Sequence, residues 1–266
     1  MKTLYKSFFI LAASLVLFQA CSKQTIYKPA APDMAALVHR YKLAVMDAKI
    51  AEPWEIDRNL VAIHYYGDSM AGQGNLRWSA DSAGRMRLLA VSWMSKGSLQ
   101  YWPAGKTFKT SSSMAHLAWI TTAPEMAVFL QKNGVADSLP LHLRIAQVLG
   151  LPPDSPNDYF VEFWVYPENL FRPTPDAEIT DHEAGLFFPH GTTPKHKSWF
   201  LGQVAIKYDT STTNAYPWTR LGYTYDWANP DHPFGLSEFV VDTSARVTVK
   251  AIYSTREYFK MSQTAN

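Results

Sequence analysis

The amino-acid sequence predicts a single α+β domain in which three to four helices pack on a largely antiparallel sheet. First, the 266 residues are 47% apolar and only 18% charged, which is typical of a globular chain of one-domain size. Second, segments with helical spacing of apolar residues are interspersed with short runs that alternate between apolar and polar residues. Third, these segments do not follow the regular strand–helix–strand order of a parallel sheet.

The first twenty residues have the composition of a signal peptide. Lys2 and Lys6 form a basic start, and an apolar core follows in residues 8–18. That core is shorter than the roughly 20 apolar residues that span a bilayer. It is followed by Ala20 and by Cys21, the only cysteine in the chain. We therefore expect residues 1–20 to be a signal peptide.

The Ala20-Cys21 pair resembles the lipobox of bacterial lipoproteins, although Phe18 and Gln19 stand where that family usually has a leucine and a small residue. The resemblance implies that Cys21 carries a lipid, that residues 21–32 are a tether and that the protein is held at a membrane of the cell envelope. An ordinary signal peptide followed by an unpaired thiol is the alternative. A chain that begins at Cys21 would keep 23 basic and 23 acidic residues, so we expect no nucleic-acid partner.

The globular domain is expected over residues 33–266 and begins with a helix. Asp33 has the side chain of an N-cap, and the apolar residues after it share one helical face. The helix must end before Pro53. The residues of that face are Met34, Leu37, Val38, Tyr41 and Val45.

A β-strand and then a β-hairpin are predicted after the first helix. Residues 59–66 form an apolar run that favours a β-strand. Residues 76–80 and 85–94 flank a turn at residues 81–84, which predicts a β-hairpin. Residues 97–113 are polar and predict an exposed loop or the edge of a hairpin.

Two helices are predicted together with their start and stop signals. Residues 118–121 are predicted to form a strand that leads into Thr122 and Glu125, a capping-box pair at the start of a helix that stops at residues 133–134. The second helix begins near Ser138 and stops at Gly150, ahead of two prolines.

The C-terminal half contributes most of the predicted sheet. Residues 159–166 are apolar on both faces apart from Glu162, which predicts a central strand. Residues 167–194 contain five prolines and are expected to be irregular, and residues 196–208 are expected to form a short helix. Residues 223–227 alternate as a half-buried strand. Two further runs, residues 237–241 and 246–253, complete the sheet.

A proline-stiffened loop carries the densest group of charged residues. Pro173 and Pro175 restrict the backbone around Arg172, Asp176 and Glu178. Carboxylates held beside an arginine are what a general acid–base pair with a charge clamp requires, so these three residues are candidate catalytic groups. The alternative is a surface loop in which the acids cap turns and the arginine pairs locally.

Glu162 is a further candidate catalytic residue. An ionised carboxylate in an apolar strand needs either a partner or a raised pKa, and perturbed acids cluster at functional sites. Arg172 or Arg220 could supply the partner. The alternative is that Glu162 reaches water at a strand end or edge.

The stretch formed by residues 216–238 combines aromatic and charged side chains. Trp218, Arg220, Asp226 and Glu238 are candidate ligand-binding residues, because aromatic faces beside hydrogen-bonding groups suit a carbohydrate or a peptide. The alternative is a packed strand in which Arg220 and Asp226 form a structural pair.

Two other chemistries find little support in the sequence. Asp181-His182-Glu183, with His190 and His196, offers zinc ligands, but their spacing matches no compact motif, so we expect neither a metal nor another cofactor. Gly67-Asp68-Ser69 resembles the nucleophile block of SGNH-type esterases. That family requires an aspartate three residues before a histidine, and none of the eight histidines has one, so we reject an esterase.

The strings FRPTPDAEITD (residues 171–181) and YPWTRLGYTYDW (residues 216–227) look like motifs of a family of uncharacterised exported bacterial proteins. The resemblance covers residues 149–241 and implies no particular activity. We therefore predict an envelope lipoprotein that acts as a ligand-binding or structural module. The alternative is a carboxylate-dependent hydrolase of an envelope or extracellular substrate, and whether the chain is an enzyme stays open.

Overall fold

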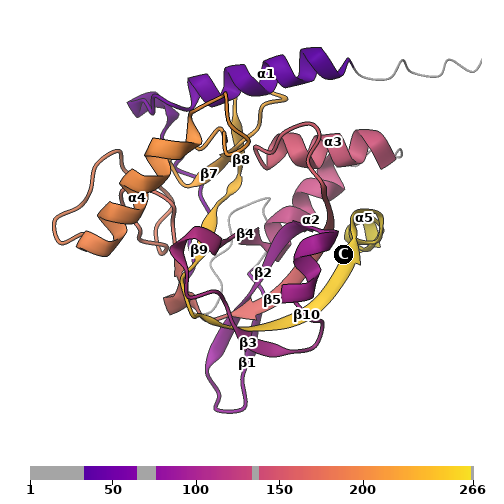
Figure 1. Cartoon of the computed structure of the whole chain (residues 1–266). Helices are drawn as coiled ribbons and strands as arrows, with labels where there is room; N and C mark the ends of the chain where they lie inside the picture. The colour runs from indigo at the N-terminus through magenta and orange to yellow at the C-terminus, as the bar shows by residue number, and fades with distance from the viewer. Residues whose placement is uncertain (1–32, 65–75, 134–137, 265–266) are drawn as a thin grey trace, which may run out of the picture. The chain divides into compact units, whose positions relative to one another are not determined.

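The computed structural model describes residues 33–64, 76–133 and 138–264. The predicted signal peptide, Cys21, the predicted tether and the Gly67-Asp68-Ser69 string lie outside these residues. From Asp33 onwards the chain forms one compact unit. Its fold is α+β, with a large antiparallel sheet and several helices, as the sequence predicts (Figure 1).

The main sheet has the strand order β3-β10-β5-β2-β4-β9-β6, and β1 pairs with β2 as the predicted hairpin. Strands β7 (Tyr223–Tyr225) and β8 (Phe234–Ser237) form a separate antiparallel pair. The strands of the main sheet are β1 (Trp78–Ala80), β2 (Met86–Ser95), β3 (Thr107–Lys109), β4 (Ala118–Thr122), β5 (Asn157–Val165), β6 (Leu170–Phe171), β9 (Phe239–Val241) and β10 (Arg246–Ser254).

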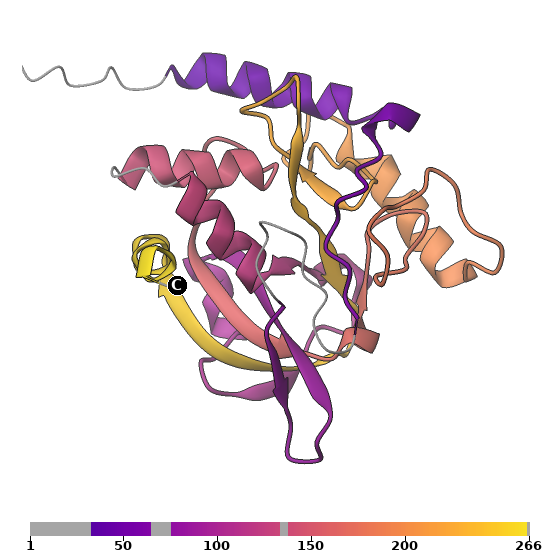
Figure 2. The same ribbon diagram turned by 180° about the vertical axis from the view of Figure 1, so that it is seen from behind.

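Strand β5 lies between β10 and β2 and is covered on both faces, which confirms the predicted central strand. On one face, Phe160 packs with helices α2 (Ala123–Lys132), α3 (Ser138–Val148) and α5 (Thr255–Thr264), which Figure 2 shows side by side. On the other face, Phe163 packs with Trp102 and with Val61 of the segment before β1.

Helices α1 (Met34–Asp47) and α4 (Pro194–Lys207) pack against the 216–238 stretch. Asp33 caps α1 as predicted, because its Oδ1 accepts a hydrogen bond from Ala35 N at 3.0 Å. The buried face of α1 contacts Tyr225 and Trp227. The buried face of α4 contacts Trp218. Residues 216–238, the aromatic stretch, therefore form part of the surface against which α1 and α4 pack.

Two local predictions are wrong. In the strand predicted over residues 59–66, the described residues 59–64 form no strand, since Ile63 N donates to Ile179 O and Leu60 N to His182 O in a loop; residues 65 and 66 lie outside the described part of the chain. The capping box is absent at α2, because the Glu125 carboxylate turns into the core. The exposed loop or hairpin edge predicted at residues 97–113 contains most of a 3-10 helix and β3, which lies at the edge of the main sheet. Short 3-10 helices occur at Pro53–Glu55, Lys96–Tyr101, Met114–His116 and Pro167–Asn169.

Candidate functional site

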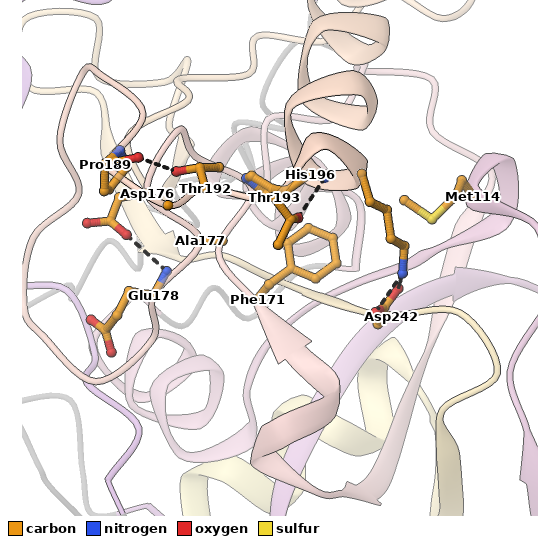
Figure 3. Close-up of a pocket in the computed structure, with 12 residues that line it drawn as sticks. Met114, Phe171, Asp176, Ala177, Glu178, Pro189, Thr192, Thr193, His196 and Asp242 are labelled. Carbon is orange, nitrogen blue, oxygen red and sulfur yellow. Dashed lines mark hydrogen bonds and ion pairs between the residues drawn. The ribbon is translucent and has the colours of Figure 1, made fainter.

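A pocket of about 320 Å³ opens between the loop that follows β6 and the start of α4 (Figure 3). It contains two of the predicted catalytic acids, Asp176 and Glu178. Figure 3 shows these acids on one side of the Phe171 ring and Asp242 on the other. The pocket is lined by Met114, Phe171, Asp176, Ala177, Glu178, Pro189, Gly191, Thr192, Thr193, Lys195, His196 and Asp242.

Hydrogen bonds from the 216–238 stretch and from α4 fix the loop that follows β6. Trp218 Nε1 donates to Pro173 O at 3.0 Å, and His196 Nε2 lies 2.8 Å from Thr174 O. A carbonyl oxygen only accepts, so Nε2 carries the proton of the imidazole in this contact. The proline-rich string and the aromatic stretch therefore meet in space, through contacts that fix the backbone of the loop.

The opposite wall of the pocket is the first turn of α4. Thr193 is the N-cap, with its hydroxyl oxygen accepting from His196 N at 3.2 Å, and Pro194 is in the first turn. Lys195 is thereby directed to Asp242 at the end of β9, and its Nζ lies 3.1 Å from both carboxylate oxygens. Burial opposes ionisation of Asp242, but hydrogen bonds from Thr243 and Lys195 hold its pKa below the ordinary value.

The two predicted acids are turn-capping groups that face the pocket. Asp176 Oδ1 accepts from Glu178 N at 3.3 Å. The Glu178 carboxylate accepts from the backbone and hydroxyl of Thr180 and, at 3.1 Å, from Asp181 N. Although burial alone would raise it, these hydrogen bonds lower the pKa of Glu178. Glu178 is therefore held as a fixed negative charge.

Arg172 is not a charge clamp in the pocket. Its side chain is 0% exposed, and its NH1 donates to Asp181 Oδ1 at 2.6 Å and to Glu183 O at 2.8 Å. Its NH2 donates to Val61 O at 3.0 Å and to Asp181 O. These bonds use the guanidinium to join the loop to the segment before β1, so the role is structural.

Glu162 is buried, but neither predicted arginine is its partner. Its Oε2 lies 2.6 Å from Lys250 Nζ, which comes from the neighbouring strand β10. Its Oε1 accepts from Tyr258 OH of α5 at 3.2 Å. The Glu162 carboxylate therefore ties the sheet to α5 and lies away from the residues that line the pocket.

The predicted pairing of Arg220 with Asp226 is also wrong. Arg144 of α3 forms a two-bond ion pair with Asp226, at 2.8 and 2.6 Å. Arg220 has a φ of 61° and donates from NH2 to Lys49 O at 2.7 Å, beyond the end of α1. Asp226 is thereby joined to α3, and Arg220 to the turn that follows α1.

The remaining candidates of the stretch are buried. Trp218 lies in a cluster with Trp199 and Phe200 of α4. Glu238 accepts from Tyr216 OH at 2.8 Å, and burial raises its pKa to about 8. Trp218, Arg220, Asp226 and Glu238 do not line the pocket beside α4. Trp218, Asp226 and Glu238 are buried and Arg220 is half-buried, so these four side chains make contacts within the fold.

Sequence reasoning missed Lys195 and Asp242 as pocket residues. The Thr193-Pro194 pair is a helix-start signal and indicates that Lys195 and His196 lie in a first turn. No comparable signal marks Asp242, because β9 is placed beside β6 only by the fold.

The described residues contain no group of three or more histidine, cysteine or acidic side chains that could hold a metal ion. In the same part of the chain, no helix combines the length and hydrophobicity that crossing a membrane requires. Comparison with protein-family models, with curated proteins and with solved structures finds no match to this chain.

Proposed function

We propose that this protein is a membrane-anchored binding module of the bacterial cell envelope, and that the pocket beside α4 takes a small ligand with a protonated amine. The lipobox-like sequence around Cys21 supports the anchor and the location. The geometry and charge of the pocket support the ligand class.

The observation that carries the ligand class is an excess of negative charge. Among the described residues that line the pocket, Asp176, Glu178 and Asp242 are acidic and Lys195 is the one lysine or arginine; behind the lining, the buried Arg172 also acts on Asp176 and Glu178. The Lys195–Asp242 pair satisfies both partners, which leaves two carboxylates on the opposite wall. An ammonium group placed between those carboxylates would gain charge-assisted hydrogen bonds.

The rest of the lining suits the carbon skeleton of such a ligand. Phe171, Met114 and Pro189 give apolar contact, and the hydroxyl groups of Thr192 and Thr193 lie at the α4 side. Amino sugars and peptide amines share the required chemistry, because each joins a cationic nitrogen to a compact, partly polar body.

A hydrolase is less well supported than a binding module. A general acid needs a pKa raised towards the working pH, whereas the pKa of Glu178 is lowered. A hydrolase would require Asp176 or Glu178 to meet Arg220 or Asp226 in one pocket, and neither Arg220 nor Asp226 lines this one.

Calorimetric titration with matched ligand pairs tests the proposal. Glucosamine is compared with glucose, and a short peptide with its N-acetylated form. We expect the amine of at least one pair to bind and its neutral form to bind at least about tenfold more weakly, since a hydrogen bond to a charged group contributes about 1.5–3 kcal/mol. The two pairs separate a carbohydrate source from a peptide source.

Asp176→Asn removes one charge with little change of shape and should weaken amine binding by about tenfold. Asp158→Asn, an exposed position on β5, is the matched control and should bind as the wild type does. Equal binding of amine and neutral ligands, or equal affinity of the two variants, would contradict the ligand class. Release of a cleaved product that is lost in Asp176→Asn would favour the hydrolase instead.

A further inference from the structure

Helix α1 and the turn after it expose a stripe of large apolar side chains. Leu43 and Met46 belong to α1, Ile50 follows its end and Trp54 lies in the 3-10 helix Pro53–Glu55; these side chains, the stripe, are 51%, 61%, 67% and 74% exposed. A helix of a globular domain normally presents polar residues on its outer face, so large exposed apolar side chains that follow one another along this segment indicate an interaction surface.

The stripe lies opposite the buried face of α1. The buried residues Leu37, Tyr41 and Val45 face Tyr225 and Trp227, whereas Leu43 and Met46 are about half a turn away from them. In Figure 1, α1 lies at the edge of the described unit with its outer side uncovered.

The orientation of the helix is fixed by hydrogen bonds to the aromatic stretch. Tyr41 OH donates to Ala215 O at 2.8 Å, and Tyr225 OH donates to Asp47 Oδ2 at 2.7 Å. Beyond the helix, Arg220 donates to Lys49 O. Turning the stripe inward would break these contacts, so its exposure is built into the fold.

Basic side chains flank the stripe. On α1, Lys42 lies on one side of Leu43 and Met46 and Arg40 on the other, and Lys49 follows the end of the helix; all three are exposed. The one acid of α1, Asp47, is engaged by Tyr225. Apolar residues between lysine and arginine flanks are typical of a helix that lies in a membrane interface, where long basic side chains reach the headgroups.

We propose that the stripe of Leu43, Met46, Ile50 and Trp54 docks on the lipid surface to which the chain is anchored, with α1 parallel to the membrane. This inference rests on the anchor in the proposed function. Cys21 is twelve residues before Asp33, so the intervening chain spans at most about 40 Å when extended and keeps α1 close to the bilayer. A pocket of about 690 Å³ adjoins Leu43 and Met46; Tyr225, Trp227 and Pro230 line it together with the charged residues Arg40 and Asp47.

Trp54 provides an internal reporter for the test. All nine tryptophans lie in the described part of the chain, and only Trp54 is strongly exposed. The full-length protein is purified from membranes and reconstituted into vesicles of phosphatidylcholine with phosphatidylglycerol, with and without acyl chains brominated near the headgroup. The difference in fluorescence between wild type and Trp54→Phe gives the Trp54 signal, and cosedimentation with the vesicles reports the anchor separately.

We expect brominated lipid to quench most of the Trp54 signal, more strongly in vesicles with phosphatidylglycerol than in pure phosphatidylcholine. Met46→Glu/Ile50→Glu should lose this quenching while it still cosediments. Leu201→Glu/Ile206→Glu, which alters exposed apolar residues of α4, is the matched control and should be quenched as the wild type is. Thermal melting checks that each variant is folded.

Each outcome of the experiment supports or refutes either the docking of the stripe on lipid or the lipid anchor at Cys21. Wild-type protein that cosediments without quenching of Trp54 overturns the docking surface and leaves the anchor intact. Quenching that survives in Met46→Glu/Ile50→Glu also overturns it. A wild type that sediments as a dimer with Trp54 protected from bromine would assign the stripe to a second copy. Loss of cosedimentation in every form would refute the anchor.

Discussion

Arg172 and Val61 are 111 positions apart in the sequence, and the Arg172 guanidinium joins them. The same group also satisfies the Asp181 carboxylate and two loop carbonyls. A buried charge that meets this many acceptors is costly to remove, because its partners are then left unpaired in a low-dielectric interior.

We expect Arg172→Met to lower the free energy of unfolding by about 3 kcal/mol or more, as measured by chemical denaturation. Arg58→Met is the matched control, since Arg58 pairs with Glu183 of the same loop at 3.3 Å but is exposed. The control should cost less than about 1 kcal/mol. If Arg172→Met and Arg58→Met lowered the free energy of unfolding equally, burial of the Arg172 guanidinium would not be the source of its contribution to stability.

The capping-box pattern of Thr122 and Glu125 predicts a surface position for Glu125, but this residue is buried in the core. Its Oε1 accepts from Ser237 N and its Oε2 from Thr121 Oγ1, both at 2.8 Å. Burial raises its pKa from 4.5 to about 7, although these hydrogen bonds favour the ionised form. A capping box and an inward acid use the same residue types, and only the tertiary fold distinguishes them.

The raised pKa of Glu125 makes stability depend on pH. In the unfolded chain Glu125 loses its proton near pH 4.5, whereas in the folded protein it keeps the proton up to about pH 7. The folded state therefore binds more protons over this window, and its free energy of unfolding falls as pH rises. Glu238, with a pKa of about 8, acts in the same direction.

Glu125→Gln removes the titration of this residue. Between pH 4.5 and pH 7 the stability of the wild type should fall relative to that of the variant, by a total of about 3 kcal/mol, and then level off. Denaturation at a series of pH values measures the difference. A wild-type curve that runs parallel to the Glu125→Gln curve would refute the assignment.

At the scale of elements, local signals predicted helices better than strands. Helices α1, α3 and α4 follow their caps, prolines and apolar spacing, which act within a few residues. Residues 59–64 have the composition of a strand, but they contact loop residues and the Ser237 hydroxyl, so no ladder forms there. Helix α5 was missed, because it continues directly from β10 without a break.

Gly222 lies where the proline-rich loop, the aromatic stretch and the segment before β1 converge. Its φ is +83°, and a Cβ at this position would lie 2.8 Å from Leu60 Cδ1 and 3.4 Å from Arg172 Cδ. Glu238 N also donates to its carbonyl at 2.8 Å, so the backbone has little room to shift. Glycine is therefore required here by both conformation and packing.

Gly222→Ala should lower the free energy of unfolding by about 2–4 kcal/mol, the sum of left-handed strain and overpacking. Gly84→Ala separates the two causes, since Gly84 has a similar φ of +78° but no atom near its Cβ position. That control should cost about 1–2 kcal/mol. If Gly222→Ala and Gly84→Ala lower the free energy of unfolding by the same amount, the close approach to Leu60 Cδ1 adds no destabilisation.

At the scale of the whole molecule, the sequence predicted one wall of the pocket and not the other. Asp176 and Glu178 were found because prolines and charges cluster within eleven residues. Lys195 and Asp242 come from α4 and from the end of β9, and their pairing depends on strand order. Ion pairs were mispredicted for the same reason, since Arg144 and Lys250 reach their acids across the fold.

The proposed lipid anchor at Cys21 is what would bring the exposed stripe close to a membrane. If Cys21 is acylated, cells that produce the wild type in the presence of labelled palmitate should yield a labelled protein, and Cys21→Ser should yield none. Ser22→Ala keeps the thiol and should be labelled as the wild type is. Equal labelling of Cys21→Ser would refute the lipid. With the lipid, the short chain between Cys21 and Asp33 would keep the exposed apolar residues within reach of a membrane; without it, those residues would need a protein partner.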